Sequence, residues 1–479
     1  MKFFLIGIIL YRLVLNLGLV RTFFVPDEFW QSTDVAHEII YRKNESLTWE
    51  WNKDNALRSP IYPYIIGYLV FYPLKLLNID SAFLIRLGPR LFHSLLTITG
   101  DFYFYNYCQI KYPKEQLHHL FLVYYSNWFL FYMSPRPLIN NVELVFVLMT
   151  GYYHLKASQT MYKLLMIVSC LFRPTSIIYM ATWLIKDLNS RNFFTKFKEY
   201  LFLTMIPLTV SVIFDSIFYQ QWTMNQVNFF LFNFFTNGAD FYGVHHKLWY
   251  LIEGIPSIMT ISTIPLVFMI VLQAGRLETD LKMRFFIPLS CLSLIGHKEI
   301  RFILPLLPVM CEIVSRVNVP KETWKKYFLQ LYTLCNIAMM VYFSLFHQIG
   351  PMSVVDLFDE WNNSGMKKIF LITPCHTIPP RSYLHSQHLD ISSLSCEPNL
   401  SGQKDYVDEA DLFFDNFKVS SKEMIAAYQP DCIVLFEKFT RELSNVLVLR
   451  GYQLERRIFH SLILTHSRHD NYINVWCRL

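Results

Sequence analysis

The sequence predicts an all-α polytopic membrane protein with a small α/β domain at its C-terminal end. Of its 479 residues, 53% are hydrophobic and only 17% are charged, whereas soluble domains carry about 25% charged residues. No charged residue occurs from Gly254 to Gly275, a stretch long enough to span the hydrocarbon core of a bilayer. After about residue 348, charged residues become frequent and short β-rich runs appear. These observations exclude a disordered chain and a purely soluble fold.

Apolar segments follow one another along residues 1–348 and predict about eleven membrane segments. The first begins after Lys2 and lacks the small residues of a signal-peptide cleavage site, so we expect it to be retained. Arg12 lies inside it, and we expect this side chain to pair within the helix bundle. Prolines interrupt several segments, which is typical of enzymes and transporters with a central cavity. The segments are 3–20, 61–78, 84–107, 117–133, 138–155, 163–185, 200–219, 248–274, 284–296, 300–316 and 327–347.

Basic residues predict the orientation of these segments. Lys and Arg cluster in the loops 186–198, 276–284 and 316–326, and we therefore place these loops in the cytosol. Residues 23–60 and 220–247, the region of His297 and everything after residue 348 then lie on the opposite face. The formal net charge of +6 is modest, and the basic residues do not gather on one face. The sequence therefore gives no indication of nucleic-acid binding.

The tail, residues 349–479, is predicted to form the α/β domain. Strands are expected at 369–373, 432–439, 452–459 and 472–477, and a helix at 421–428. Four of the nine cysteines lie here, namely Cys375, Cys396, Cys432 and Cys477. In a domain outside the cytosol they can form disulfides, and four cysteines allow three pairings. A Cys375–Cys396 bridge is one of these.

Three Asn-x-Ser sequons fall in segments placed outside the cytosol. They begin at Asn44, Asn362 and Asn399, and we expect these asparagines to be glycosylated. No nucleotide-binding glycine motif, serine-hydrolase motif or Cys-x-x-Cys pair is present. His37-Glu38 begins like a zinc-binding helix, but position 41, where the second histidine would stand, is Tyr. We therefore predict no metal site and no cofactor.

Two acidic residues, Asp27 and Glu28, follow the first membrane segment among aromatic residues at 24–31. A carboxylate at the edge of low-dielectric surroundings can act as a general base. Because the two residues are adjacent, they point in different directions at a helix start, and both need not face the same cavity. Alternatively, Asp27 caps the following helix, with Pro26 fixing its entry.

Cations cluster at two other places on the same predicted face. His297, Lys298 and Arg301 stand at the mouth of a membrane segment, where they suit the binding of a phosphate. The alternative is that they are ordinary interface cations with Glu299 as an ion-pair partner. A second cluster, His245, His246 and Lys247, lies in an aromatic loop and is a weaker candidate for contact with a phosphate or sugar. That loop also suits a membrane-interface belt.

Several motifs together resemble glycosyltransferase family 22, the endoplasmic-reticulum mannosyltransferases that use dolichyl phosphate mannose. They are Pro26-Asp-Glu28 with Gln31, Leu47-Thr-Trp-Glu-Trp51, Leu57-Arg-Ser-Pro60, Asn141-Val-Glu143, Arg173-Pro-Thr175 and His297-Lys-Glu-Ile-Arg-Phe302. In the tail, Pro374-Cys-His-Thr-Ile-Pro379, Tyr383-Leu-His385, Cys396-Glu-Pro398 and Asp408-Glu-Ala-Asp411 resemble the branch of the family that acts on glycosylphosphatidylinositol (GPI). The chain departs from this pattern at Pro380-Arg381 and in a polar spacer at 386–394.

The resemblance implies the GT-C fold, with a membrane domain at 1–348, a catalytic first luminal loop at 23–60 and a luminal domain at 349–479. It implies transfer of the third, α1,2-linked mannose, with inversion, from dolichyl phosphate mannose to a GPI precursor in the endoplasmic-reticulum membrane. On this basis Asp27 is the base, Glu28 orients or substitutes for it, and the cluster at His297, Lys298 and Arg301 binds the donor phosphate. Arg58 and Arg173 are further candidates for substrate contact.

Other functions are also compatible with the sequence. A related enzyme of the same family could add mannose to the lipid-linked precursor of N-glycans. A secondary transporter would also contain broken helices and an intramembrane arginine, although the sequence contains no inverted repeat. A non-catalytic scaffold of a glycosylation complex is a third alternative.

Overall fold

The computed structural model describes residues 2–42, 47–189, 191–235, 243–317, 322–362, 367–385, 389–399 and 406–478. The chain forms two compact units. The first comprises Met1–Gly18, Glu50–Ile65 and Arg90–Met340, and the second comprises Leu19–Trp49, Ile66–Pro89 and Val341–Leu479. The second unit therefore combines the tail with two segments from the N-terminal part of the chain.

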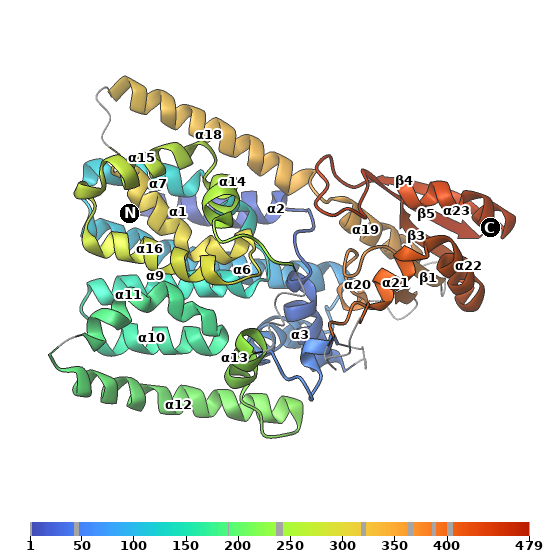
Figure 1. The fold of residues 1–479 in the computed structure, drawn as a ribbon, viewed down its shortest axis with the longest axis horizontal. Helices are drawn as coiled ribbons and strands as arrows, with labels where there is room; N and C mark the ends of the chain where they lie inside the picture. The colour runs from blue at the N-terminus through green and yellow to red at the C-terminus, as the bar shows by residue number, and fades with distance from the viewer. Residues whose placement is uncertain are drawn as a thin grey trace. The chain divides into compact units, whose positions relative to one another are not determined.

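Residues 2–345 form a succession of helices (Figure 1). Many are short, and π-helical or 3-10 turns join them. The elements are α1 (Lys2–Leu10), η1 (Tyr11–Asn16), α2 (Leu17–Leu19), η2 (Phe29–Thr33), α3 (Asp34–Tyr41), η3 (Trp49–Trp51), α4 (Ile61–Ile66), η4 (Gly67–Phe71), α5 (Tyr72–Leu76), α6 (Ala82–Lys111), α7 (Lys114–Tyr125), α8 (Trp128–Met133), α9 (Ile139–Leu155), α10 (Gln159–Phe172), η5 (Pro174–Ser176), α11 (Ile177–Leu188), α12 (Phe193–Tyr219), α13 (Asn225–Phe235), η7 (Tyr250–Gly254), α14 (Ile255–Met259), η8 (Thr260–Ser262), α15 (Thr263–Leu272), η9 (Ala274–Arg276), α16 (Thr279–Leu294), η10 (Ile300–Leu306), α17 (Leu307–Ser315) and α18 (Glu322–Leu345).

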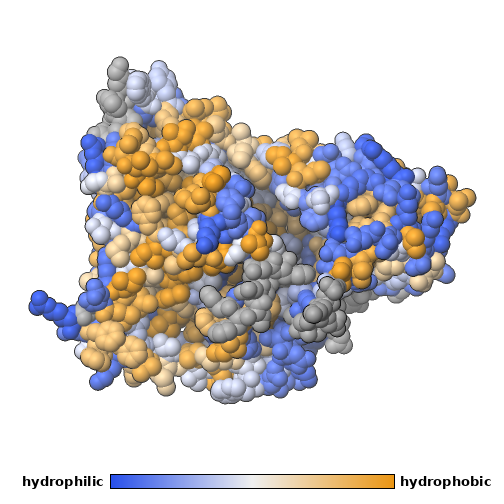
Figure 2. All heavy atoms as spheres, viewed as in Figure 1, coloured by the Kyte–Doolittle hydropathy of each residue, from blue (hydrophilic) through white to orange (hydrophobic). Residues whose placement is uncertain are grey.

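The predicted apolar segments coincide with helical stretches. Among the described residues, three helices are long and apolar enough to cross a membrane, at Phe193–Tyr219, Tyr250–Leu272 and Thr323–Trp361. The predicted segment 163–185 is two helices, α10 and α11, which break at Arg173-Pro174. About eleven crossings therefore remains a prediction. Figure 2 shows apolar residues predominating on the visible surface of the helical part and polar residues on that of the tail.

Arg12 pairs within the helix bundle, as the sequence predicts. Its Nε and Nη2 donate to the two carboxylate oxygens of Asp101 at 2.8 and 3.2 Å, and both side chains are fully buried. Tyr124 donates to the same carboxylate at 3.0 Å. A buried charge requires such partners, because an uncompensated one is strongly destabilising.

The tail contains a mixed five-stranded sheet with helices. Its strands are β1 (Lys367–Ile372), β2 (Leu389–Ser393), β3 (Cys432–Phe436), β4 (Tyr452–Phe459) and β5 (Tyr472–Arg478), in the order β2-β1-β3-β5-β4. β1 pairs in parallel with β2 and β3, whereas β5 pairs in antiparallel with β3 and β4. The helices are α19 (Gly350–Asn362), α20 (Arg381–Leu384), α21 (Glu409–Asp415), α22 (Phe417–Tyr428) and α23 (Glu437–Leu449).

The α/β nature of the tail is confirmed, with two corrections. The run predicted as one strand at 432–439 ends at Phe436, where α23 begins. The polar spacer at 386–394 contains an unpredicted strand, β2, paired along β1 from Lys367 opposite Leu389 to Leu371 opposite Ser393. β2 lies at the edge of the sheet, so only one side of it is paired.

Alternating residues of the central strands face two separate hydrophobic cores. On β1, Ile369 and Leu371 enter one core, while Phe370 and Ile372 enter the other. Helices α21, α22 and α23 line the second core. The first core contains residues of α19 and also Phe23 and Phe29, from the segment that follows the first apolar stretch. This segment is therefore packed into the core of the second unit.

Candidate functional site

Asp27 and Glu28 lie in the first turn of a helix that starts at Pro26. The carbonyl of Pro26 accepts from the backbone amides of Phe29 and Trp30 at 2.9 and 3.1 Å. Asp27 directly follows the first carbonyl acceptor of this helix, and its capping role stays a prediction. The two acids have different surroundings, since Asp27 is half-buried and Glu28 is buried. Asp27 is the more accessible of the two carboxylates.

His376, a residue of the tail, lies close to the segment that carries Asp27 and Trp30. Its ring lies edge-on to that of Trp30, with 4.7 Å between centroids. Burial lowers the pKa of His376, and the negative charge of Asp27 partly offsets that decrease. His376 follows β1, at the carboxyl end of the parallel strands, where α/β sheets commonly place functional groups. Asp27 and His376 therefore interact electrostatically within the second unit.

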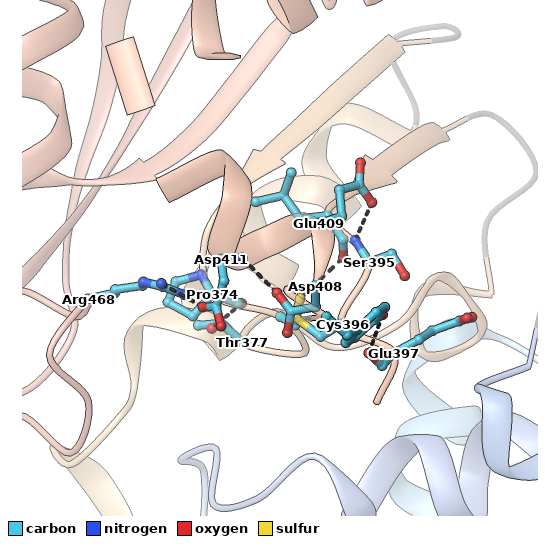
Figure 3. Close-up of a disulfide and its surroundings, with 12 residues drawn as sticks. Pro374, Thr377, Ser395, Cys396, Glu397, Asp408, Glu409, Asp411 and Arg468 are labelled. Atoms are coloured by element: carbon cyan, nitrogen blue, oxygen red, sulfur yellow. Dashed lines mark hydrogen bonds and ion pairs between the residues drawn. A yellow bond between two sulfur atoms is a disulfide. The ribbon is translucent and has the colours of Figure 1, made fainter. Parts of the chain in front are cut away.

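A disulfide holds the loop that carries His376. Cys375 is bonded to Cys396, with 6.1 Å between the Cα atoms (Figure 3). Next to it, the amide of Ser395 donates to Glu409 at 2.9 Å, and the amide of Asp411 donates to Asp408 at 2.6 Å (Figure 3). The bridge links the loops after β1 and β2. A second disulfide joins Cys432 on β3 to Cys477 on β5.

His37, which lacks the spacing of a zinc ligand, is part of a different arrangement. Its Nε2 lies 2.9 Å from Nδ1 of His385, and Nε2 of His385 lies 3.6 Å from a carboxylate oxygen of Asp80. His37 is buried on α3, and His385 ends α20. This row of polar side chains connects α3 to the tail within the second unit.

His297, Arg301 and Arg173 lie around the ring of Phe302 in the first unit. The guanidinium carbons of Arg173 and Arg301 lie 5.1 and 5.4 Å from the ring centroid, and the ring of His297 is centred 6.0 Å away. We call Arg173, His297, Arg301 and Phe302 the Phe302 cluster. The structure thus brings together two arginines that are far apart in the sequence.

Carboxylates orient the cations of the Phe302 cluster. Arg301 donates to both oxygens of Glu299 at 2.7 and 2.6 Å, and Nε2 of His297 lies 3.2 Å from the same carboxylate. Burial by itself lowers the pKa of His297, but hydrogen bonding to Glu299 and its charge outweigh burial and raise that pKa. Arg173 lies 3.6 Å from the buried Glu143. The cluster is therefore pre-organised, and part of its positive charge is neutralised.

Lys298 has a different environment from its neighbours. Its ammonium donates to the carbonyls of His245 at 3.1 Å and Gly296 at 3.4 Å, and also to that of Ile295. The residue is 2% exposed. These contacts tie the segment around His245 to the loop before η10. Lys298 therefore organises the backbone around the cluster.

Of the remaining candidates, His245 lies beside the Phe302 cluster. The ring of His245 is centred 6.4 Å from that of His297. His246 and Lys247 are exposed, and His246 lies 3.9 Å from Glu253. Arg58 donates to Glu50 at 2.7 Å from Nη2. Arg58 is thus held by a carboxylate of its own segment.

Of the three sequons, only the last has a described asparagine side chain. Asn399 is exposed. Asn44 lies outside the described residues, and Asn362 ends α19 with its side chain outside the described part. Exposure at Asn399 is compatible with glycosylation.

In the part of the chain that the structure describes, one group of side chains has the spacing of metal ligands. It comprises Cys432, Glu455 and Cys477. Both thiols of this group are joined in a disulfide, so neither can supply a thiolate. The group therefore does not provide the anionic sulfur ligands that zinc prefers.

His376 is the site residue that sequence reasoning did not single out. It stands in the motif 374–379, but the motif alone gives no partner for it. Asp27, whose charge acts on the pKa of His376, lies far away in the sequence, and both residues belong to the second unit. The proximity of Arg173 to Arg301 is likewise a tertiary contact.

The chain is similar to known mannosyltransferases over most of its length. The chain matches the Alg9-like mannosyltransferase family over residues 3–385. It is 32% identical over 461 residues to the mouse GPI alpha-1,2-mannosyltransferase 3, covering 94% of this chain and 84% of the mouse protein. The GPI mannosyltransferase 3 of Candida albicans is 32% identical over 494 residues, covering 98% and 97% of the two chains.

Solved structures show the same fold at low sequence identity. ArnT from Cupriavidus metallidurans bound to undecaprenyl phosphate superposes with a TM-score of 0.59 at 11% identity, covering 100% of this chain and 98% of that one. The apo state of ArnT gives a TM-score of 0.57 at 9% identity. The match agrees with the GT-C fold that the sequence resemblance implied.

Proposed function

Because the chain belongs to the Alg9-like mannosyltransferase family, we propose that it adds the third mannose to the GPI precursor, in an α1,2 linkage. The donor is dolichyl phosphate mannose, and the acceptor is a dimannosyl glycolipid. The observation that carries this proposal is the near-complete coverage of GPI mannosyltransferases from mouse and Candida albicans. The tail motifs around Cys375 and Cys396 are included in that coverage.

Asp27 serves as the general base of an inverting displacement. The acceptor hydroxyl oxygen attacks C1 of the donor mannose while its proton passes to the Asp27 carboxylate. The bond between C1 and the phosphate oxygen breaks, and dolichyl phosphate leaves with that electron pair. The half-buried position of Asp27 supports this role, since Glu28 is buried. Glu28 orients Asp27 or substitutes for it, and His376 contributes a neighbouring imidazole.

Arg301, Arg173 and His297 stabilise the departing phosphate. The negative charge on the phosphate increases as the bond breaks, so fixed cations favour the transition state over the ground state. Guanidinium groups suit this task because they can donate two parallel hydrogen bonds to phosphate oxygens. The pre-organisation of both arginines around Phe302 supports the assignment. Lys298 acts by holding the surrounding backbone.

The chain is a multi-pass membrane protein, and we assign it to the endoplasmic-reticulum membrane with its tail in the lumen. Two disulfides in the tail support this location, because disulfides persist in oxidising compartments. We also assign catalysis without a metal or cofactor. Activity that disappears with a chelator and returns with manganese would contradict that assignment.

The glycolipid that accumulates in cells lacking the protein tests this function. We expect a GPI precursor with two mannoses to accumulate, and expression of the wild-type chain to remove it. Accumulation of a lipid-linked N-glycan precursor would instead assign the protein to the other branch of the family. Normal glycolipids, with a changed distribution of a solute, would indicate a transporter.

A further inference from the structure

The connection between β4 and β5 carries a conspicuous apolar tip. Leu462, Ile463 and Leu464 are consecutive and are 68%, 58% and 43% exposed. The residues on either side, Ser461 and Thr465, are polar. Large aliphatic side chains exposed side by side in a connecting loop mark an interaction surface. We call residues 462–464 the apolar tip.

Hydrogen bonds fix the base of this loop to the chain directly after α18. The amide of Ile349 donates to the carbonyl of His460 at 3.0 Å, and Nδ1 of His347 lies 3.0 Å from Oγ of Ser461. The amide of Ile463 itself donates to the hydroxyl of Tyr342 at 3.2 Å. The tip is therefore held beside the C-terminal end of α18 (Figure 1).

α18 belongs to one of the three described helical stretches that are long and apolar enough to cross a membrane. Exposed apolar side chains recur along it and continue to Val341 and Phe346, which are 43% and 48% exposed. Tyr342 and Phe343 stand at the same end, where aromatic residues mark the membrane–water interface. These features are typical of a helix end at a membrane surface.

We propose that the apolar tip inserts into the lipid leaflet at the C-terminal end of α18. The tip then contacts the acyl chains of the bilayer, because it is held beside Tyr342 at the end of a helix that is long and apolar enough to cross a membrane, and because residues 462–464 carry no charge. A soluble protein partner is the alternative occupant. The side chains of residues 462–464 offer it no charge and no hydrogen-bonding group. The tip anchors the α/β domain to the membrane at a second point besides the chain connection.

Spin labels on the full-length protein in phosphatidylcholine nanodiscs test this insertion. Ile463→Cys places a label on the tip, and Val419→Cys places one on α22 at a position that is 59% exposed, nearly the same as Ile463. Labelled wild-type protein measures the background from its free thiols. We expect the label at 463 to collide more with oxygen, which concentrates in lipid, than with a water-soluble nickel chelate. The label at 419 should show the opposite preference.

A label at 463 that is as accessible to the nickel chelate as the label at 419 would overturn the proposal. If Ile463→Cys fails to fold, Leu462→Cys replaces it, since Leu462 is 68% exposed and makes the same prediction. Collision rates do not depend on mannose transfer. The result is therefore independent of the proposed function.

Discussion

Asp27 is the residue on which proton transfer in the proposed reaction depends. Asp27→Asn nearly preserves the size of the side chain but removes its ability to accept a proton. We expect mannose transfer to fall by roughly 10²–10⁴-fold, about 3–5 kcal/mol of barrier, with normal expression and membrane insertion. Measured turnover of the purified variant checks this.

Glu28→Gln is the matched control, because Glu28 is adjacent but buried at 4% exposure. It should lower transfer much less than Asp27→Asn does. If Glu28→Gln abolishes transfer while Asp27→Asn retains it, the roles of the two acids are reversed. If both retain transfer, the base lies elsewhere.

Arg301 tests the assignment of the donor phosphate. Arg301→Lys keeps the charge but loses the planar pair of donors, so we expect kcat/KM for the donor to fall roughly 10-fold or more. Arg316→Lys is the control, since Arg316 also pairs with a carboxylate, Glu278, at 2.9 Å. Equal losses of protein abundance and of donor use at Arg301 would indicate a structural role instead.

The sequence identified most candidate residues, but not which of them meet. Motif resemblance pointed to Asp27, Arg173 and Arg301 individually. Arg173 and Arg301 meet at the ring of Phe302, and the charge of Asp27 acts on His376, although these residues are far apart in the sequence. No local pattern contains that information. Lys298 was expected to bind phosphate, and its burial among carbonyls became visible only in three dimensions.

The disulfide between Cys375 and Cys396 joins the loop after β1 to the loop after β2. Replacing both cysteines with Ser should lower the stability of the tail by about 3 kcal/mol, since the bridge closes a loop with a sequence separation of 21. Thermal unfolding of the purified protein measures the loss, with Cys335→Ser, a free thiol on α18, as control. Mass mapping that finds all four tail thiols free in native protein would contradict the account.

Histidines in the β4–β5 connection predict a pH dependence of the tail. Burial, together with the charge of His347, lowers the pKa of His460 to about 4, and burial, together with His460 and His466, lowers that of His469 to about 3. The unfolded chain therefore binds more protons than the folded one below about pH 6.5. Stability should be full above that pH and fall on acidification, by up to about 1.4 kcal/mol per pH unit for each histidine.

Thermal unfolding between pH 7.5 and pH 5 checks this dependence. His460→Leu should make the transition temperature of the tail less sensitive to pH, because one of the two groups no longer titrates. A pH dependence of the tail that is unchanged in His460→Leu would show that other groups cause it.

At the level of elements, the apolar strands and the largely polar β4 were predictable, whereas the polar edge strand β2 was not. β3 is apolar throughout because both of its faces meet a core. β2 contains Asp390 and two serines and pairs on one side only. Its sequence therefore lacks the hydrophobic pattern that predicts a strand. α23 follows β3 without a gap, and so the end of that strand was placed too late.

The whole molecule consists of two units that the linear sequence does not delimit. Phe23 and Phe29 belong to the same core as Val354 and Ile369, although more than 300 residues lie between them. Sequence patterns report local periodicity and composition, whereas this packing depends on shape complementarity between distant segments. The membrane character and the α/β tail followed from composition. The joining of residues 19–49 to the tail did not.

Reconstitution of the purified wild-type protein tests the proposed function most directly. In liposomes that contain dolichyl phosphate mannose and a dimannosyl GPI precursor, we expect a trimannosyl product that an α1,2-specific mannosidase returns to the starting glycolipid. Asp27→Asn protein under the same conditions should form little product. No transfer to the GPI precursor, together with transfer to a lipid-linked N-glycan precursor by the same preparation, would contradict the account.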